Sequence, residues 1–312
     1  MNRECDERTR VIDVLGTPLR VRACACAQDG GDPRPLEGHI RLQLSILPSS
    51  WCMADCPFCI AAPHDRMDAM DLKRLEHVLL RLKDADLLRG VTITGGEPFA
   101  DVKRVDRIVS MLFGIFGTDL EITLDTNGCA IERIGEIREL VHVDTIHVSR
   151  HHYDDEINRK LFGTDAVPDA ETLKRAMHSV SFRDLFVMNC MLLRDHIGTA
   201  QEVHRYLDFA IETGAGKVAF ITGTPVNDYM RRQRVEYDEV IRRDDPAFLF
   251  TRSFRDYEWC RCQDGVYCSE AGLIEFYGRR TDARGCDYCR GLVYGPDNLL
   301  RAGFNGPVIA QG

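Results

Sequence analysis

Apolar and polar residues follow two alternating patterns along most of the chain, one typical of strands and one typical of amphipathic helices. Residues 39–47 alternate between polar and apolar side chains, which predicts a strand. Leucines at positions 72, 75, 79 and 82 step by three and four residues, which predicts a helix with one buried face. The same signals predict further strands over 90–94, 120–126, 145–149, 185–193 and 217–222, and further helices over 105–116, 134–141, 170–180 and 200–213.

Six predicted strands that alternate with helices through short connections predict an α/β fold, in which crossover helices join parallel strands. In such folds the functional side chains collect where the strands end. The chemically notable residues follow predicted strands, at 52–59, 95–98, 125–127, 149–152 and 223–225. The pattern breaks after residue 226, where the mixed-charge run 231–245 predicts a solvated helix or linker. A region of cysteines, glycines and short strands begins at Trp259.

Composition narrows the function classes open to this 312-residue chain. No apolar stretch approaches the roughly 18 residues that a membrane-spanning helix needs. The charged N-terminus, MNRECDERTR, is unlike a secretory signal. We therefore expect a cytoplasmic protein with no membrane partner. The net charge of −9 argues against nucleic acid binding and slightly favours a cationic ligand.

Thirteen cysteines are the most informative feature of the composition. In a cytosolic chain, cysteines at this density are more often metal ligands or catalytic groups than a disulfide framework. Most of them fall into two dense groups, Cys52, Cys56 and Cys59 in the first and Cys260, Cys262, Cys268, Cys286 and Cys289 in the second. The two groups predict two soft-metal sites, whereas the isolated Cys129 and Cys190 fit a packing role.

The first group has C-x3-C-x2-C spacing directly after a predicted strand. Three thiolates on one tight loop can bind three irons of a cubane cluster and leave the fourth iron open. Zinc is the alternative, but structural zinc takes four ligands, and the nearest further candidate in the sequence is His64. The next strand ends in Gly95-Gly96-Glu97-Pro98, where glycines allow close approach of a ligand and Glu97 offers a carboxylate to an ammonium group.

Together the two motifs resemble those of the radical S-adenosylmethionine (SAM) superfamily over roughly residues 39–225. The resemblance implies a partial (β/α)6 barrel in which Cys52, Cys56 and Cys59 hold a [4Fe-4S] cluster whose open iron binds SAM. It implies that Gly95, Gly96 and Glu97 receive the methionine ammonium, and that Phe58 packs near the adenine. It also implies one-electron cleavage of SAM to a 5′-deoxyadenosyl radical that abstracts hydrogen from a substrate, with an electron donor such as flavodoxin or ferredoxin.

Other polar residues at predicted strand ends are candidate SAM contacts. These are Thr126, Asn127, Ser149, Arg150 and Asn189, and each has a capping or barrel-filling role as its alternative. The histidine-rich segment 149–156 supplies His151, His152 and Tyr153 as candidate substrate contacts, with metal binding by the histidines as a minor alternative.

The second cysteine group resembles the C-terminal region of twitch or SPASM domains, which bind an auxiliary [4Fe-4S] cluster. Cys286 and Cys289 have C-x2-C spacing, and residues 290–301 predict a hairpin after them. In the GTP-cyclising enzymes of this type a third cysteine follows the hairpin, but Gly303 stands there and the Arg-x-Arg pattern is absent, which argues against that reaction. Cys268 with Cys260 or Cys262 can complete the ligand set, for which we select Cys262. A zinc knuckle is the alternative, and one cysteine, for which we select Cys268, can instead donate a hydrogen atom to a substrate radical.

We therefore predict an N-terminal extension (1–38), a barrel (39–225), a helical linker (226–258) and a cysteine-rich auxiliary-cluster region (259–312). The extension looks too short for a separate peptide-recognition domain, which favours a small substrate. The first hypothesis is a radical SAM tailoring enzyme, an epimerase or dehydrogenase, acting on an amino sugar, nucleoside or similar molecule. The second is a maturase that modifies a ribosomal peptide. A non-catalytic iron–sulfur or zinc sensor is the hypothesis from another class.

Overall fold

The computed structural model describes residues 9–22, 39–60, 70–180, 185–242, 244–246, 248–253, 263–269, 274–280 and 288–312. Its strands are β1 (Thr9–Val14), β2 (Thr17–Arg22), β3 (Leu42–Ile46), β4 (Leu88–Ile93), β5 (Glu121–Thr126), β6 (Thr145–Ser149), β7 (Phe186–Met191), β8 (Lys217–Thr222), β9 (Phe248–Ser253), β10 (Gln263–Ser269), β11 (Glu275–Arg280), β12 (Leu292–Tyr294), β13 (Leu299–Arg301) and β14 (Val308–Gln311). Its α-helices are α2 (Leu72–Asp84), α3 (Val102–Phe116), α4 (Asp155–Phe162), α5 (Ala170–Ser179), α6 (Ala200–Thr213), α7 (Asp228–Gln233) and α8 (Tyr237–Val240). Short 3-10 helices are η2 (Pro98–Asp101), η3 (Ile131–Glu136) and η4 (Leu140–His142).

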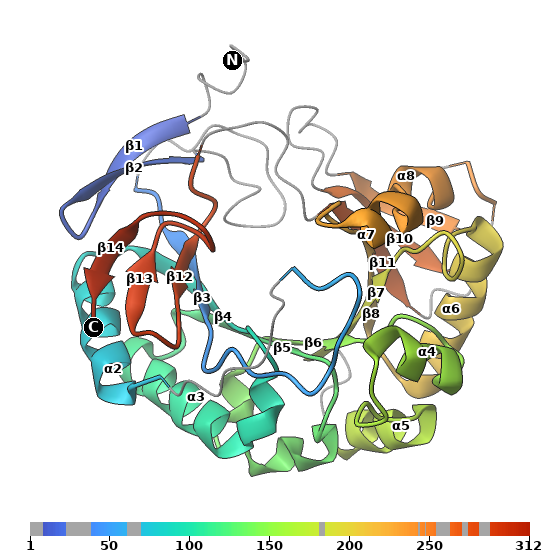
Figure 1. Cartoon of the computed structure of the whole chain (residues 1–312), viewed down its shortest axis with the longest axis horizontal. Coiled ribbons are helices and arrows are strands. Elements are labelled where there is room, and N and C mark those ends of the chain that lie inside the picture. Colours follow the sequence, from blue (N-terminus) through green and yellow to red (C-terminus); the bar gives the residue numbers. More distant parts are fainter. Residues whose placement is uncertain are drawn as a thin grey trace.

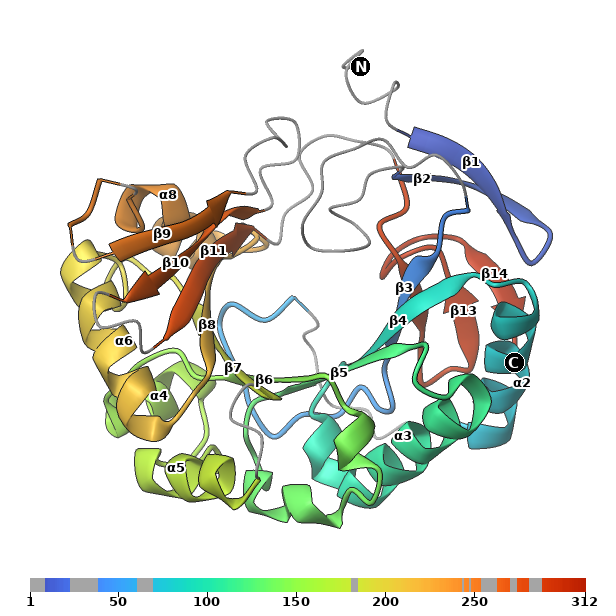
Figure 2. The same cartoon turned by 180° about the vertical axis from the view of Figure 1, so that it is seen from behind.

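A single curved sheet forms the body of the molecule. Among the described residues it contains twelve strands, in the order β14-β13-β12-β3-β4-β5-β6-β7-β8-β11-β10-β9. Strands β3 to β8 run parallel in sequence order, and β12 and β11 continue the parallel pairing at the two edges of this set. The sheet bends into an incomplete ring around a central space (Figures 1 and 2). The predicted α/β fold with a partial (β/α)6 barrel is therefore confirmed.

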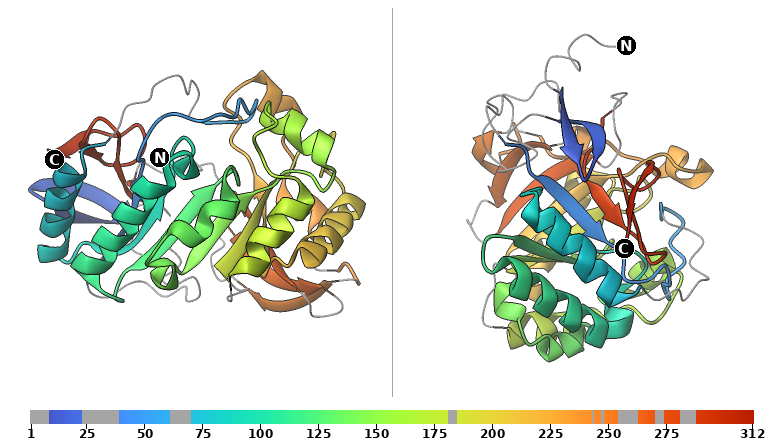
Figure 3. Two further views of the ribbon diagram at one scale, coloured as in Figure 1. Left: turned by 90° about the horizontal axis from the view of Figure 1, so that it is seen from below. Right: turned by 90° about the vertical axis from the view of Figure 1, so that its left-hand side faces the viewer.

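Helices cover the outer face of the ring, as the views in Figures 1 and 3 show. They form because their apolar residues recur at helical spacing and because polar side chains cap their first turns. In α2, for example, Leu75 and Leu82 are fully buried against the sheet, and the Asp71 carboxylate accepts hydrogen bonds from the backbone N–H groups of Lys73 and Arg74. The apolar core thus lies between helices and sheet, which leaves the inner face of the ring for polar side chains.

Strand and helix predictions from residue 39 to residue 222 agree with the structure except in two places. The helix predicted over 134–141 is instead the pair of 3-10 turns η3 and η4. Exposed Gly135 and the β-branched isoleucines beside it lower the helix propensity of this segment. Helix α4 was not predicted, although Asp154 caps its start and Gly163 its end.

The predicted C-terminal hairpin is confirmed by the antiparallel pairing of β12 with β13, and Asn298 adopts a positive φ of 63° in the turn. The sequence did not indicate that β12 also pairs with β3, nor that the N-terminal segment holds the hairpin β1–β2. The backbone N–H of Cys289 donates to the carbonyl of Arg20, which ties this hairpin to the C-terminal region (Figure 2). Segment 226–258, expected to be a helical linker, contains α7 and α8 but also strand β9. The domain boundaries stay predictions.

None of the helices in the described ranges is long and apolar enough to cross a membrane.

Candidate functional site

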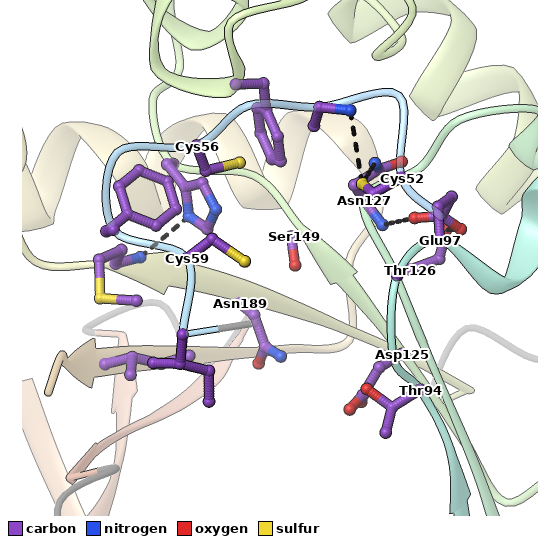
Figure 4. A pocket seen from close by; sticks show the side chains of 18 of the residues that line it. Cys52, Cys56, Cys59, Thr94, Glu97, Asp125, Thr126, Asn127, Ser149 and Asn189 are labelled. Atoms are coloured by element: carbon purple, nitrogen blue, oxygen red, sulfur yellow. Dashed lines mark hydrogen bonds between the residues drawn. The ribbon is translucent and has the colours of Figure 1, made fainter. Parts of the chain in front are cut away.

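The three cysteines of the first group line one cavity at the carboxyl ends of the parallel strands. Their loop follows β3 and lies inside the outline of the ring in Figure 1, and Figure 4 shows the cavity from close by. The loop is fixed by neighbours distant in sequence, because Asp55 N–H donates to the Phe162 carbonyl at 2.8 Å and the Asn227 side chain donates to the Pro57 carbonyl at 2.8 Å. The cavity has a volume of about 260 Å³.

Burial and mutual proximity disfavour three anionic sulfurs in this cavity unless a cation joins them. Burial raises the pKa of the Cys56 thiol, and the negative charges of Cys59 and Cys52 raise it further. Burial also raises the pKa of Cys52, with smaller contributions from Glu97 and Cys59. A metal centre removes this penalty because it binds the thiolate forms directly. The three sulfur donors therefore suit an iron–sulfur cluster. Within the described ranges, no group of three or more histidine, cysteine or carboxylate side chains is placed to hold a single metal ion.

The glycine pair after β4 lets the backbone pass close under the cysteine loop. Gly95 has a φ of 121°, which side chains with a Cβ rarely adopt, and a Cβ at Gly96 would come within 2.0 Å of the Trp51 carbonyl oxygen. The backbone N–H of Gly96 donates to the Ser49 carbonyl, and that of Glu97 donates to the Trp51 carbonyl. The two glycines therefore couple the end of β4 to the loop that carries Cys52.

Glu97 is the centre of a buried hydrogen-bond cluster that joins two strand ends. Its carboxylate accepts from the Thr126 hydroxyl at 2.6 Å, from the Asn127 N–H at 2.6 Å and from the Phe99 N–H at 2.8 Å. The side chain is 3% exposed, and burial raises the pKa of Glu97 to about 7 although these three donors oppose the shift. Glu97 therefore positions Thr126 and Asn127 as well as lining the cavity.

Most of the other predicted cofactor contacts line the same cavity. Asn127 donates from its side chain to Cys52 Sγ at 3.7 Å, and Ser149 lies between the cysteines and Asn189 in Figure 4. Asn189 is 6% exposed, and its Oδ1 atom has no hydrogen-bond partner among the described residues. A buried carbonyl oxygen without a partner is costly, so this atom marks a place for a ligand donor. Phe58 packs edge-on against the His151 ring, with 4.8 Å between centroids.

Three predicted residues do not line the cavity in the described structure. Arg150 is 1% exposed and donates to the backbone carbonyls of His152, Tyr153 and Pro168 and to Asp155 at 2.5 Å. This arrangement favours the packing role that the sequence left open for it. His152 accepts from the Asp154 N–H, and Tyr153 donates to Glu202, so both engage the surrounding loop.

His151 does reach the cavity, with its imidazole enclosed by aromatic side chains. Its Nδ1 atom accepts from the Met191 N–H at 3.1 Å, which places the ring proton on Nε2. The ring stacks on Phe162 and meets the edge of Phe58. Burial, helped by the charge of Arg150, lowers the pKa of His151 to about 3. The side chain is therefore a neutral donor at every pH at which the protein works.

We expect the depressed pKa of His151 to make the cluster-free protein less stable in acid. Between pH 6.5 and the folded pKa near 3, unfolded chains take up a proton that native His151 rejects, so stability falls with falling pH. The loss should be about 1.4 kcal/mol per pH unit. The variant His151→Gln, which retains an acceptor for Met191, should show a shallower acid loss in urea unfolding between pH 6.5 and about pH 5.

Glu97 has the opposite effect on stability between pH 6.5 and about pH 5. Its raised pKa makes the native state bind a proton more readily than the unfolded chain, so this residue adds stability as the pH falls. Glu97→Gln should therefore show a steeper acid loss than the wild type. Equal slopes for the wild type and His151→Gln would contradict the assignment of His151.

The second cysteine group is only partly within the described residues. Cys262 and Cys286, like Cys260, lie outside them, whereas Cys268 is on β10 and Cys289 precedes β12. These two described cysteines belong to opposite ends of the strand order, β10 beyond β8 and β12 beyond β3. The ligand set of a second cluster and the hydrogen-donor role of Cys268 stay predictions.

Arg279 lines the cavity but was not a candidate, and Asp125, which is in the predicted strand-end group 125–127, was given no role. Asp125 precedes the predicted Thr126 by one position, and the inward alternation of β5 was the signal that indicated it. Arg279 is on β11, which continues the parallel sheet beyond β8. The local pattern of residues 275–280 does not indicate this pairing, because the residues of a strand do not specify which distant strand lies beside it.

Comparisons with known proteins agree with this fold. Residues 46–197 match the family model described as the radical SAM superfamily. Three crystal structures of SuiB from Streptococcus suis are similar in fold, one without a named ligand, one bound to S-adenosylmethionine and one bound to the precursor peptide SuiA. Their TM-scores are 0.59, 0.58 and 0.55, each at 16% identity, and 86%, 86% and 85% of this chain is covered.

The chain spans 60–63% of the length of the SuiB chains. At this low identity the likeness establishes the fold alone. None of the curated proteins compared with the chain matches it.

Proposed function

We propose that this chain, which belongs to the radical SAM superfamily through residues 46–197, is an enzyme that cleaves SAM reductively and abstracts hydrogen from a substrate bound in the barrel. The observation that carries the proposal is the convergence of two separate sequence motifs on one cavity. Cys52, Cys56 and Cys59 come from the loop after β3, and Gly95, Gly96 and Glu97 come from the end of β4. Neither motif alone is as specific as the two together.

The three cysteines would hold a [4Fe-4S] cluster, and the cavity residues beside them would hold SAM. When bound, this pair supplies the one-electron cleavage of SAM that yields the 5′-deoxyadenosyl radical. The candidate SAM contacts are Phe58, Gly95, Gly96, Glu97, Thr126, Asn127, Ser149 and Asn189.

The residues of the chain itself position the reactants and exclude water. Buried Phe58 and Phe162 enclose the cysteine loop on its apolar side, which limits access of solvent to the sulfurs. The hydrogen bonds from Thr126 and Asn127 to Glu97 fix the end of β5 relative to the end of β4. A site fixed in this way by hydrogen bonds needs little rearrangement when the cofactor binds.

The direct test is anaerobic reconstitution with iron and sulfide, followed by incubation with SAM and dithionite. The proposal predicts formation of 5′-deoxyadenosine and methionine. A protein that only senses redox state or metal would yield neither product, and that result would reject the enzyme assignment.

Glu97→Gln should weaken SAM binding more than it affects cluster assembly. The carboxylate is lost but the cysteines are untouched, and a charge-assisted hydrogen bond contributes about 1.5–3 kcal/mol, which is tenfold or more in affinity. SAM affinity can be measured by equilibrium dialysis with the cluster content followed by its absorption. Loss of the cluster with SAM affinity intact would show that Glu97 has another role.

The substrate class is the finer part of the proposal. We favour a small molecule that carries an amino group, with epimerisation or dehydrogenation as the outcome and a flavodoxin or ferredoxin as electron donor. The fold likeness to SuiB, one structure of which holds a precursor peptide, supports peptide modification as a second candidate. A short peptide encoded beside the gene of this chain and modified by the reconstituted enzyme would establish that second function.

We also propose a second [4Fe-4S] cluster held by the C-terminal cysteines. A variant that lacks Cys52, Cys56 and Cys59 should then retain roughly half of the iron and sulfide after reconstitution, because a second cubane has its own thiolates. Further replacement of Cys286 and Cys289 should remove the remainder. Metal analysis that finds zinc and no iron in the triple variant would reject the auxiliary cluster and leave the barrel assignment untouched.

A further inference from the structure

The inner face of the barrel carries a set of polar side chains that the SAM and cluster sites do not use. Thr94 directly follows β4, Asp125 is the last residue but one of β5, and His147 is in the middle of β6. The pairing register sets Asp125 directly beside His147, and His147 Nδ1 lies 2.7 Å from Asp125 Oδ1. Figure 4 shows Thr94 next to Asp125, at the far end of the cavity from Cys56.

A cation faces these residues from the added strand β11. Arg279 lines the same cavity, and Tyr277 is two positions earlier on the same strand. Burial raises the pKa of Tyr277, the charge of Arg279 lowers it, and the charge of Asp125 raises it further. Both charged side chains are therefore close enough to Tyr277 to affect it. Within the part of the chain that the structure describes, Arg279 forms no ion pair, although it lines the cavity that Asp125 also lines.

Arg279 is close enough to Asp125 for its charge to affect that carboxyl group, but the two side chains, both among the described residues, form no ion pair with each other. Although burial opposes the shift, the hydrogen bond and charge of His147, with the charge of Arg279, lower the pKa of Asp125, so its carboxylate is ionised. His147 and Thr94 use part of the hydrogen-bonding capacity of this carboxylate. An ionised carboxylate and a guanidinium that forms no ion pair with the described residues are complementary to a ligand that carries both a donor cation and an anionic acceptor.

Asn189, which is also a candidate SAM contact, indicates a ligand in the cavity between these residues. The Oδ1 atom of Asn189 is buried and has no hydrogen-bond partner in the described structure. Asn189 lies on β7, between the wall of Asp125 on β5 and that of Arg279 on β11 in the strand order. Native proteins seldom leave a buried carbonyl oxygen without a donor, so a bound molecule is expected to supply one.

Resting on the proposed function, we propose that Asp125 and Arg279 form a subsite for an amino-carboxylate group of the substrate. Arg279 binds the carboxylate, and Asp125 accepts hydrogen bonds from the ammonium. The substrate is therefore a molecule with a free amino acid group. This group would bind next to the cavity residues that would hold SAM. SAM itself carries such a group, so the test must distinguish the two sources.

The test uses the reconstituted, SAM-loaded holoenzyme and three probes of similar size: L-serine, L-lactate and serinol. Serine has both charged groups, lactate lacks the ammonium, and serinol lacks the carboxylate. Saturation-transfer NMR should detect binding of serine, weaker binding of lactate and no binding of serinol. Arg279→Gln should reduce the affinity for serine and lactate about tenfold or more. Asp125→Asn should reduce the affinity for serine but not the affinity for lactate.

Arg301→Gln is the matched control, because Arg301 pairs with Asp297 on the C-terminal hairpin, outside the cavity. It should leave probe binding unchanged, and all three variants should bind SAM as the wild type does. Equal binding of serine and serinol, no binding of serine, or full binding of serine by Arg279→Gln would overturn the subsite. Parallel loss of SAM binding in Arg279→Gln would assign Arg279 to SAM and also overturn it. Failure of the proposed function is a separate result, since it would appear as absence of SAM cleavage by the wild type.

Discussion

Cys56→Ala should abolish SAM cleavage while the protein stays folded. A methyl group cannot replace a thiolate ligand, and a cubane that loses one of three protein ligands is not held. The fold should survive because the barrel core lies between the helices and the sheet, whereas Cys56 is only partly buried on a loop. The measurement is 5′-deoxyadenosine formation by the anaerobically reconstituted variant, with circular dichroism as the check on folding.

Cys129→Ala is the matched control for this experiment. Cys129 is also partly exposed and follows the end of β5, but it does not line the cavity in the described structure. The control should cleave SAM as the wild type does. Undiminished 5′-deoxyadenosine formation by Cys56→Ala would overturn the central assignment.

Gly96→Ala should have the second largest effect, although it adds only one methyl group. The new Cβ would lie 2.0 Å from the Trp51 carbonyl oxygen and 2.8 Å from the Ser50 carbonyl carbon, and both of these are backbone atoms. The segment before Cys52 must therefore move, which breaks the hydrogen bond from the Glu97 N–H to Trp51. Strain of this kind costs about 1–3 kcal/mol, so we expect a loss of SAM affinity of roughly fivefold to a hundredfold.

Gly114→Ala tests the same chemical change at a site without neighbours. Gly114 is inside α3, and a Cβ there would meet no atom within 4 Å. Because alanine is the better helix former, this control should raise the free energy of unfolding by about 0.5–1 kcal/mol and leave SAM binding unchanged. Wild-type SAM affinity in Gly96→Ala would show that the close approach of the two loops is not needed for binding.

The alternating strands and helices from residue 39 to residue 222 could be predicted from the local sequence pattern, because each element buries one face against the same core. A strand or helix with such a face has few alternatives, so residues 72–82 and 145–149 were predicted nearly to their ends. The segment 131–142 was not, because weak propensity and a glycine left its backbone to be decided by packing. Helix α4 was not predicted because its eight residues are too few for a clear helical periodicity.

By itself the sequence determined the parallel α/β architecture and the two motifs at the cysteine loop and Gly95–Glu97, because spacing along a few residues fixes local geometry. Only the tertiary structure decided which side chains share the cavity. It directed Arg150 into its own loop, and it brought Arg279 from β11 toward the cavity that Asp125 lines. The position of Arg279 depends on long-range pairing, because β11 pairs with β8 and no local pattern in either strand specifies the other. Hydrophobic periodicity records which face of an element is buried, but not which distant strand lies beside it.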